Sequence, residues 1–92
     1  MEPRRGIVTP ELDRWGRLAE RDARRTAVVR LRGGTDPVQA ASRLATIGMT
    51  VASSGPASVI GEVTPDVLSR IGQESWVLAV EPSQILRQLG DG

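Results

Sequence analysis

The chain contains no cysteine, histidine or lysine among its 92 residues. Without cysteine there is no disulfide framework, thiol nucleophile or cysteine-bound zinc site. Without histidine the commonest general base and metal ligand is missing, and without lysine there is no Schiff-base chemistry and no phosphate-binding lysine of a P-loop. We therefore expect a protein that is not an enzyme, that holds no cofactor or metal, and that acts by binding.

Aromatic residues are almost absent: there is no phenylalanine or tyrosine, and Trp15 and Trp76 are the two tryptophans. A hydrophobic content of 39% still leaves a core to bury, which must be aliphatic. The length predicts one domain. No apolar run approaches 18 residues and Met1–Ile7 lacks the apolar stretch of a signal peptide, so we expect a cytoplasmic protein without membrane contact.

Charge is unevenly distributed, although the net charge is only +1. Residues 1–32 hold nine arginines against five acidic residues, and residues 33–92 hold three against six. An arginine-rich contact with nucleic acid through residues 10–32 is one hypothesis. We favour a solvated face instead, because acidic residues stand among the arginines and the expected strands offer one stacking aromatic. A nucleic-acid partner is therefore not expected.

The apolar spacing alternates between helical and strand periods along the chain. Thr9-Pro10-Glu11 is typical of a helix start and predicts a helix from Pro10 to Arg25. Further on, we expect strands at 26–32, 49–53, 58–63 and 76–81. We also expect a helix over Asp36–Gly48 and a short one that starts at Thr64-Pro65-Asp66 and ends near Gly72. This order predicts an α+β fold, a ferredoxin-like βαββαβ sandwich with an additional N-terminal helix.

Three segments follow from this pattern: an N-terminal extension with an arginine-bearing helix (1–25), the sandwich domain (26–82) and a C-terminal tail (83–92). The two crossover helices of such a sandwich cover one sheet face. Strand alternation places Val28, Arg30, Thr50, Ala52 and Glu62 on the other face. That face is more apolar than solvent requires, so either the N-terminal helix folds over it or another protein docks there.

The second half of the chain resembles the inhibitor-I9 family, the prodomains of subtilisin-like serine proteases and their free-standing inhibitor relatives. The resemblance lies in Gly61-Glu62-Val63-Thr64-Pro65-Asp66-Val67-Leu68, then Ile71, then Trp76-Val77-Leu78-Ala79-Val80-Glu81-Pro82-Ser83. The family often carries an aromatic residue where this chain has Ala79, and residues 1–25 have no counterpart in the minimal family pattern. The family's βαββαβ fold agrees with the one that the periodicity predicts.

This resemblance implies an inhibitor or folding chaperone of a subtilisin-like serine protease. The open sheet face would pack on the protease through Val28, Arg30 and Ala52. Glu62 and Glu81 would then cap helix N-termini of the partner. The tail would lie in the substrate cleft and contribute Ile85, Leu86, Arg87 and Leu89 by β-strand addition.

Alternatives remain open on the sequence. The tail also has the spacing of a short helix, with Ser83 as cap and Gly90 after its end. The same open face could serve another dedicated protein or a homodimer formed about a two-fold axis, without any inhibition. Glu62 and Glu81 could form a catalytic carboxylate pair, but we favour the interpretation that both are solvated carboxylates near strand ends.

Overall fold

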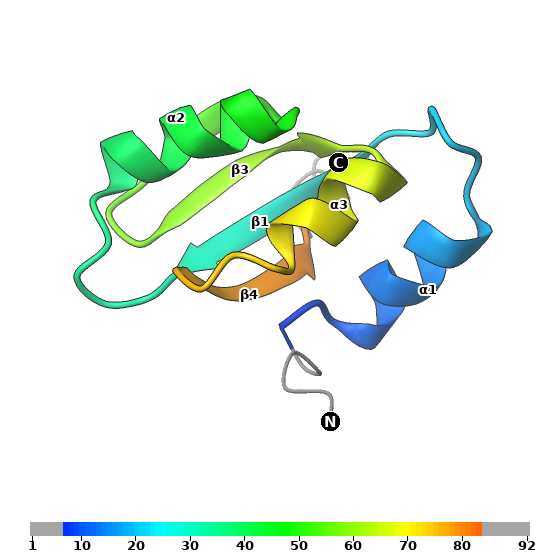
Figure 1. Ribbon diagram of the computed structural model, residues 1–92, viewed down its shortest axis with the longest axis horizontal. Helices are drawn as coiled ribbons and strands as arrows, with labels where there is room; N and C mark the ends of the chain where they lie inside the picture. Colours follow the sequence, from blue (N-terminus) through cyan, green and yellow to red (C-terminus); the bar gives the residue numbers. More distant parts are fainter. Residues whose placement is uncertain (1–6, 84–92) are drawn as a thin grey trace, which may run out of the picture.

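A four-stranded sheet carries its helices on one side (Figure 1). The computed structural model describes residues 7–83. Its elements in chain order are α1 (Pro10–Leu18), β1 (Arg25–Leu31), α2 (Pro37–Ile47), β2 (Thr50–Ser54), β3 (Ser58–Val63), α3 (Pro65–Ile71) and β4 (Val77–Pro82). The strand order is β2-β3-β1-β4 and every neighbouring pair is antiparallel. The predicted α+β class is therefore confirmed.

Local chemistry at both ends defines α2. The Asp36 side chain accepts a hydrogen bond from the backbone N–H of Val38 at 3.0 Å, and Pro37 occupies the first helical position, where its missing N–H costs nothing. Gly48 ends the helix with a φ of 130°, a conformation that glycine adopts without strain. The chain can therefore turn at once into β2.

The core lies between the helices and the sheet and is aliphatic, as the composition predicts. Alternation along β1 directs Ala27, Val29 and Leu31 to the helix side, where each is buried. The buried members of the core are Leu12, Ala27, Val29, Leu31, Ala40, Leu44, Met49, Val59, Val63, Val67, Leu68, Ile71, Val77 and Val80. The helices pack on this face of the sheet, and in the described residues no helix lies on the other face.

The first helix is shorter than predicted. It ends at Leu18, so the expectation of a helix to Arg25 was wrong. Leu18 is 77% exposed although it continues the apolar spacing of Leu12 and Trp15. Because Leu18 has no apolar surface to pack on, tertiary packing does not support further helical turns.

The position of α1 decides one of the alternatives left open by the sequence. Figure 1 shows α1 beside α3, and Leu12 joins the same buried cluster as the side chains of α2 and α3. Upstream of α1, Val8 pairs in parallel with Val80 of β4: the Thr9 N–H donates to the Val80 carbonyl at 3.0 Å. The segment 7–18 thus extends the helix layer and lines the β4 edge. Of the two alternatives for the open sheet face, cover by the N-terminal helix is therefore the one that the structure contradicts.

Candidate docking face

The side of the sheet that turns away from α2 and α3 is called here the open face. In β1 it is formed by the residues that alternate with the buried Ala27, Val29 and Leu31. Backbone pairing then assigns their neighbours on the adjacent strands. The open face consists of Thr26, Val28, Arg30, Thr50, Ser53, Ser58, Ile60, Glu62, Ala79 and Glu81.

Val28 and Ile60 form the apolar centre of the open face. They are direct partners across β1 and β3, and both are half-buried. The sequence analysis named Val28 but missed Ile60. The signal was present, because Ile60 stands two residues before Glu62 on the same strand and period-two alternation puts both side chains on one face.

Charged side chains flank this centre on two sides. Arg30 Nε lies 3.4 Å from Glu81 Oε2, and the two side chains are 57% and 38% exposed. On the other side Arg24 Nη1 lies 4.0 Å from Glu62 Oε1 and 3.5 Å from the Thr50 hydroxyl. Exposed pairs of this kind contribute about 0–1 kcal/mol, so they are easily exchanged for contacts with a partner.

The two predicted site carboxylates are not brought together. Glu62 lies on β3 opposite Thr26, whereas Glu81 lies on β4 opposite Val28, with β1 between the two strands. Each carboxylate has an arginine as its nearest charged neighbour. The two carboxylates therefore form two separate ion pairs and do not form an acid–base dyad.

Ala52 occupies a different place from the other predicted residues. Val51 pairs with Gly61 and Ser53 with Ile60, so Ala52 is the extra residue of a β-bulge in β2. Its side chain is exposed, but Ser53 takes the position opposite Ile60. Ala52 thus lies at the sheet edge, beside the open face.

A shallow depression adjoins the apolar centre at the end of the sheet where β3 begins. It has a volume of about 280 Å³ and is lined by Val28, Arg30, Leu31, Ala57, Ser58 and Leu78. Leu78 is 49% exposed. The register of β4 against β1 shifts between Arg30 and Leu31, which leaves Leu78 without a partner in β1.

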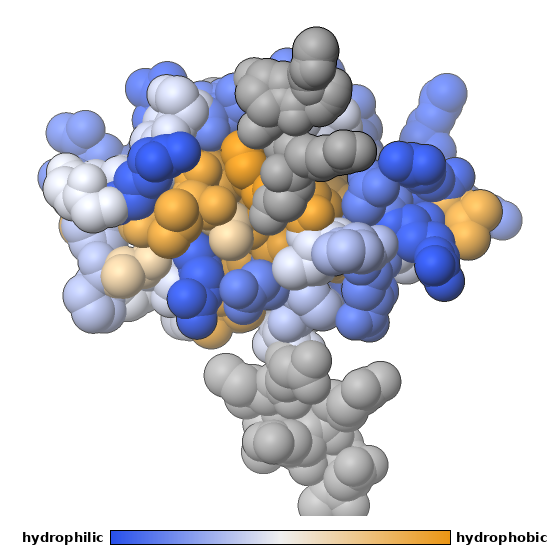
Figure 2. Space-filling model, turned by 90° about the horizontal axis from the view of Figure 1, so that it is seen from below, coloured by the Kyte–Doolittle hydropathy of each residue, from blue (hydrophilic) through white to orange (hydrophobic). Residues whose placement is uncertain are grey.

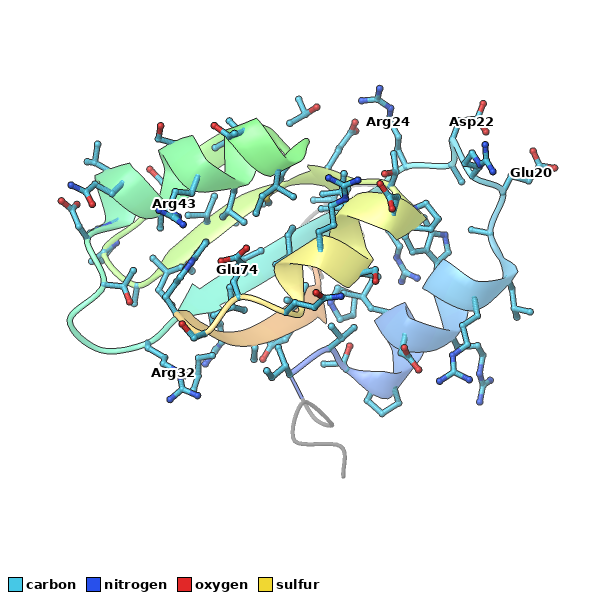
Figure 3. The ribbon with its side chains drawn as sticks, in the orientation of Figure 1. Glu20, Asp22, Arg24, Arg32, Arg43 and Glu74 are labelled. Carbon is cyan, nitrogen blue, oxygen red and sulfur yellow. The ribbon has the colours of Figure 1, made fainter. Side chains whose placement is uncertain are left out.

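The side of the molecule that carries β4 and α1 also has apolar surface. Apolar side chains gather at its centre and hydrophilic ones surround them (Figure 2). At the far end of the molecule, acidic Glu20 and Asp22 project beside Arg24 from the connection between α1 and β1 (Figure 3). The arginines of the N-terminal half are thus mixed with acids in space as well as in sequence.

Several expectations lie outside this geometry. Ile85, Leu86, Arg87 and Leu89, and with them the choice between an extended and a helical tail, fall outside the described residues. Within residues 7–83 no group of three or more acidic side chains is placed to hold a metal ion. None of the helices in that part of the chain is long and apolar enough to cross a membrane.

Comparisons of this chain with protein-family models, with curated proteins and with solved structures find no significant match.

Proposed function

We propose that the chain is a non-catalytic protein-binding domain that docks through the open face. The observation that carries this proposal is the uncovered apolar centre, Val28 and Ile60, with Leu78 exposed beside it. In the described residues all three helices lie on the opposite side of the sheet, so burial of this centre requires another chain or another segment. Apolar patches rimmed by polar residues are typical of protein interaction sites.

The fold proposed for this domain is the ferredoxin-like βαββαβ sandwich. Its support is the order β2-β3-β1-β4 in a wholly antiparallel sheet, together with the two connections β1-α2-β2 and β3-α3-β4. Each connection joins strands that lie two positions apart, with one strand of the other unit between them. The helix α1 is an addition at the β4 side.

The partner that the inhibitor-I9 resemblance implies is a subtilisin-like serine protease, with the chain acting as its inhibitor or folding chaperone. Two features support this mode. The apolar centre has no helix over it in the described residues, and the carboxylates of Glu62 and Glu81, 51% and 38% exposed, flank it, where each would stabilise the N-terminus of a partner helix. The chain itself performs no reaction in this proposal.

The test is a titration of subtilisin with the full chain and with a chain that ends at Ser83. We expect inhibition by the full chain, and loss of inhibition when residues 84–92 are removed, because the tail is the segment proposed for the substrate cleft. A full chain that leaves subtilisin fully active and is itself left uncleaved would contradict the inhibitor form of the proposal.

A further inference from the structure

The open face carries opposite charges at diagonal positions about its apolar centre. Glu62 pairs with Thr26 at one end of the β1–β3 ladder, and Arg30 pairs with Ser58 at the other end. Val28 and Ile60 pair midway between them. From strand spacing and rise, the α-carbons of Arg30 and Glu62 are separated by about 14 Å, so the two side chains do not interact within one chain.

This diagonal arrangement is self-complementary. Two copies can meet face to face about a two-fold axis that lies in the plane between their sheets. A residue on one side of this axis then faces, in the other copy, the residue that lies equally far from the axis on the opposite side of that copy's face. With the axis through the apolar centre and perpendicular to the line from Glu62 to Arg30, each Glu62 faces the other copy's position 30. Val28 and Ile60 of the two copies then pack on each other.

We infer that the open face pairs two copies of this chain into a two-fold dimer. The inference rests on the proposed function, because it uses the same docking face and names a second copy as its occupant. The ion pairs within one chain do not prevent it. Arg30 and Glu62 are at least half exposed in their side chains and are held only by weak surface pairs with Glu81 and Arg24.

The size of the face determines what kind of dimer forms. Four strands of about six residues cover about 20 Å by 20 Å, or about 400 Å² of flat area for each copy. The total of about 800 Å², increased by side-chain relief, lies below or near the lower limit of stable interfaces, about 1,200 Å². The dimer is therefore reversible and dissociates on dilution, and a protease or other partner competes with the second copy for the face.

The test uses charge reversal in the full chain. Arg30→Glu puts a carboxylate opposite Glu62 at both contacts of the dimer, and Glu62→Arg puts a guanidinium group opposite Arg30 at both contacts. Each variant alone therefore weakens self-association by about tenfold or more. A mixture of the two variants restores it, because both contacts in the mixed dimer then join opposite charges.

Sedimentation measures self-association directly, for the wild type, for each variant and for the equimolar mixture. We expect the wild-type mass to rise from 9.9 kDa towards twice that value as concentration increases. We also expect single variants that stay monomeric and a mixture that dimerises, with circular dichroism showing that both variants fold. A monomeric wild type at about 1 mM, or a mixture no heavier than its components, would overturn the inference.

Two further outcomes separate this inference from the proposed function. A chain ending at Ser83 that dimerises while the full chain does not would overturn it and assign the face to residues 84–92 of the same chain. Subtilisin inhibition by a wild-type chain that stays monomeric would also overturn it, while leaving the docking function intact.

Discussion

Gly16 of α1 lies against Leu68 of α3, where a Cβ at position 16 would come within 3.3 Å of Leu68 Cδ2. The missing side chain lets the two helices approach closely and allows Leu12 to reach the core. In the sequence Gly16 is a weakness in a helix, because glycine lowers helix propensity. In the structure it allows α1 to pack closely on α3.

Substitution of Gly16 by valine tests this packing. The introduced methyl groups would collide with Leu68, so α1 must move away from α3, and we expect the free energy of unfolding to fall by about 1–3 kcal/mol. Urea unfolding followed by circular dichroism measures the change. Arg17→Val is the control, since Arg17 stands next in the same helix and its side chain is 76% exposed. Valine has a higher helix propensity than glycine, so a Gly16→Val protein as stable as the wild type would show that α1 does not approach Leu68 this closely.

The close approach of β2 and β3 gives a second prediction. A Cβ on Gly61 would overlap with the backbone carbonyl oxygen of Thr50, whereas a Cβ on Gly55 would meet nothing closer than 3.9 Å. Gly61→Ala should therefore separate the two strands and cost about 3 kcal/mol or more, while Gly55→Ala should change stability by no more than about 0.5 kcal/mol. Thermal unfolding of both variants compares them. Gly61→Ala with wild-type stability would show that the strands do not approach this closely.

Two threonine–proline sequences begin helices, but only one threonine caps its helix with its side chain. Thr64 Oγ1 accepts a hydrogen bond from the Val67 N–H at 3.3 Å, whereas Thr9 Oγ1 is buried without a partner. Thr64→Ala should cost about 1 kcal/mol, and Thr9→Ala should be neutral or stabilising because it removes an unsatisfied buried hydroxyl. Urea unfolding of the two matched variants tests the difference. A larger loss for Thr9→Ala would refute the assignment of the caps.

The sequence predicted the element order and the facing of β1 because the relevant signals are local. Alternation in residues 26–31 assigns Val28 and Arg30 to one face before any pairing is known, and Asp36-Pro37 predicts the start of α2. The same alternation extends to Ile60, which the analysis overlooked. Local chemistry thus predicts which residues share a strand face.

The sequence did not predict the features that depend on strand pairing and on helix packing. The bulge that displaces Ala52 follows from the register of β2 against β3, and no residue type in Thr50–Ser54 predicts it. The end of α1 at Leu18 depends on what surface is available for packing, as the exposed Leu18 shows. The diagonal relation of Arg30 and Glu62 likewise requires the β1–β3 register.

The measurement that tests the docking face most directly compares Val28→Asp with Val38→Asp. Val28 lies at the centre of the open face, whereas Val38 is 75% exposed on α2, on the opposite side of the sheet. Both variants introduce the same charge, and both are assayed for self-association by sedimentation and for inhibition of subtilisin. We expect Val28→Asp to abolish the association that the wild type shows and Val38→Asp to preserve it, with both proteins folded. Association that survives Val28→Asp unchanged, or a wild type that neither self-associates nor inhibits, would contradict the account.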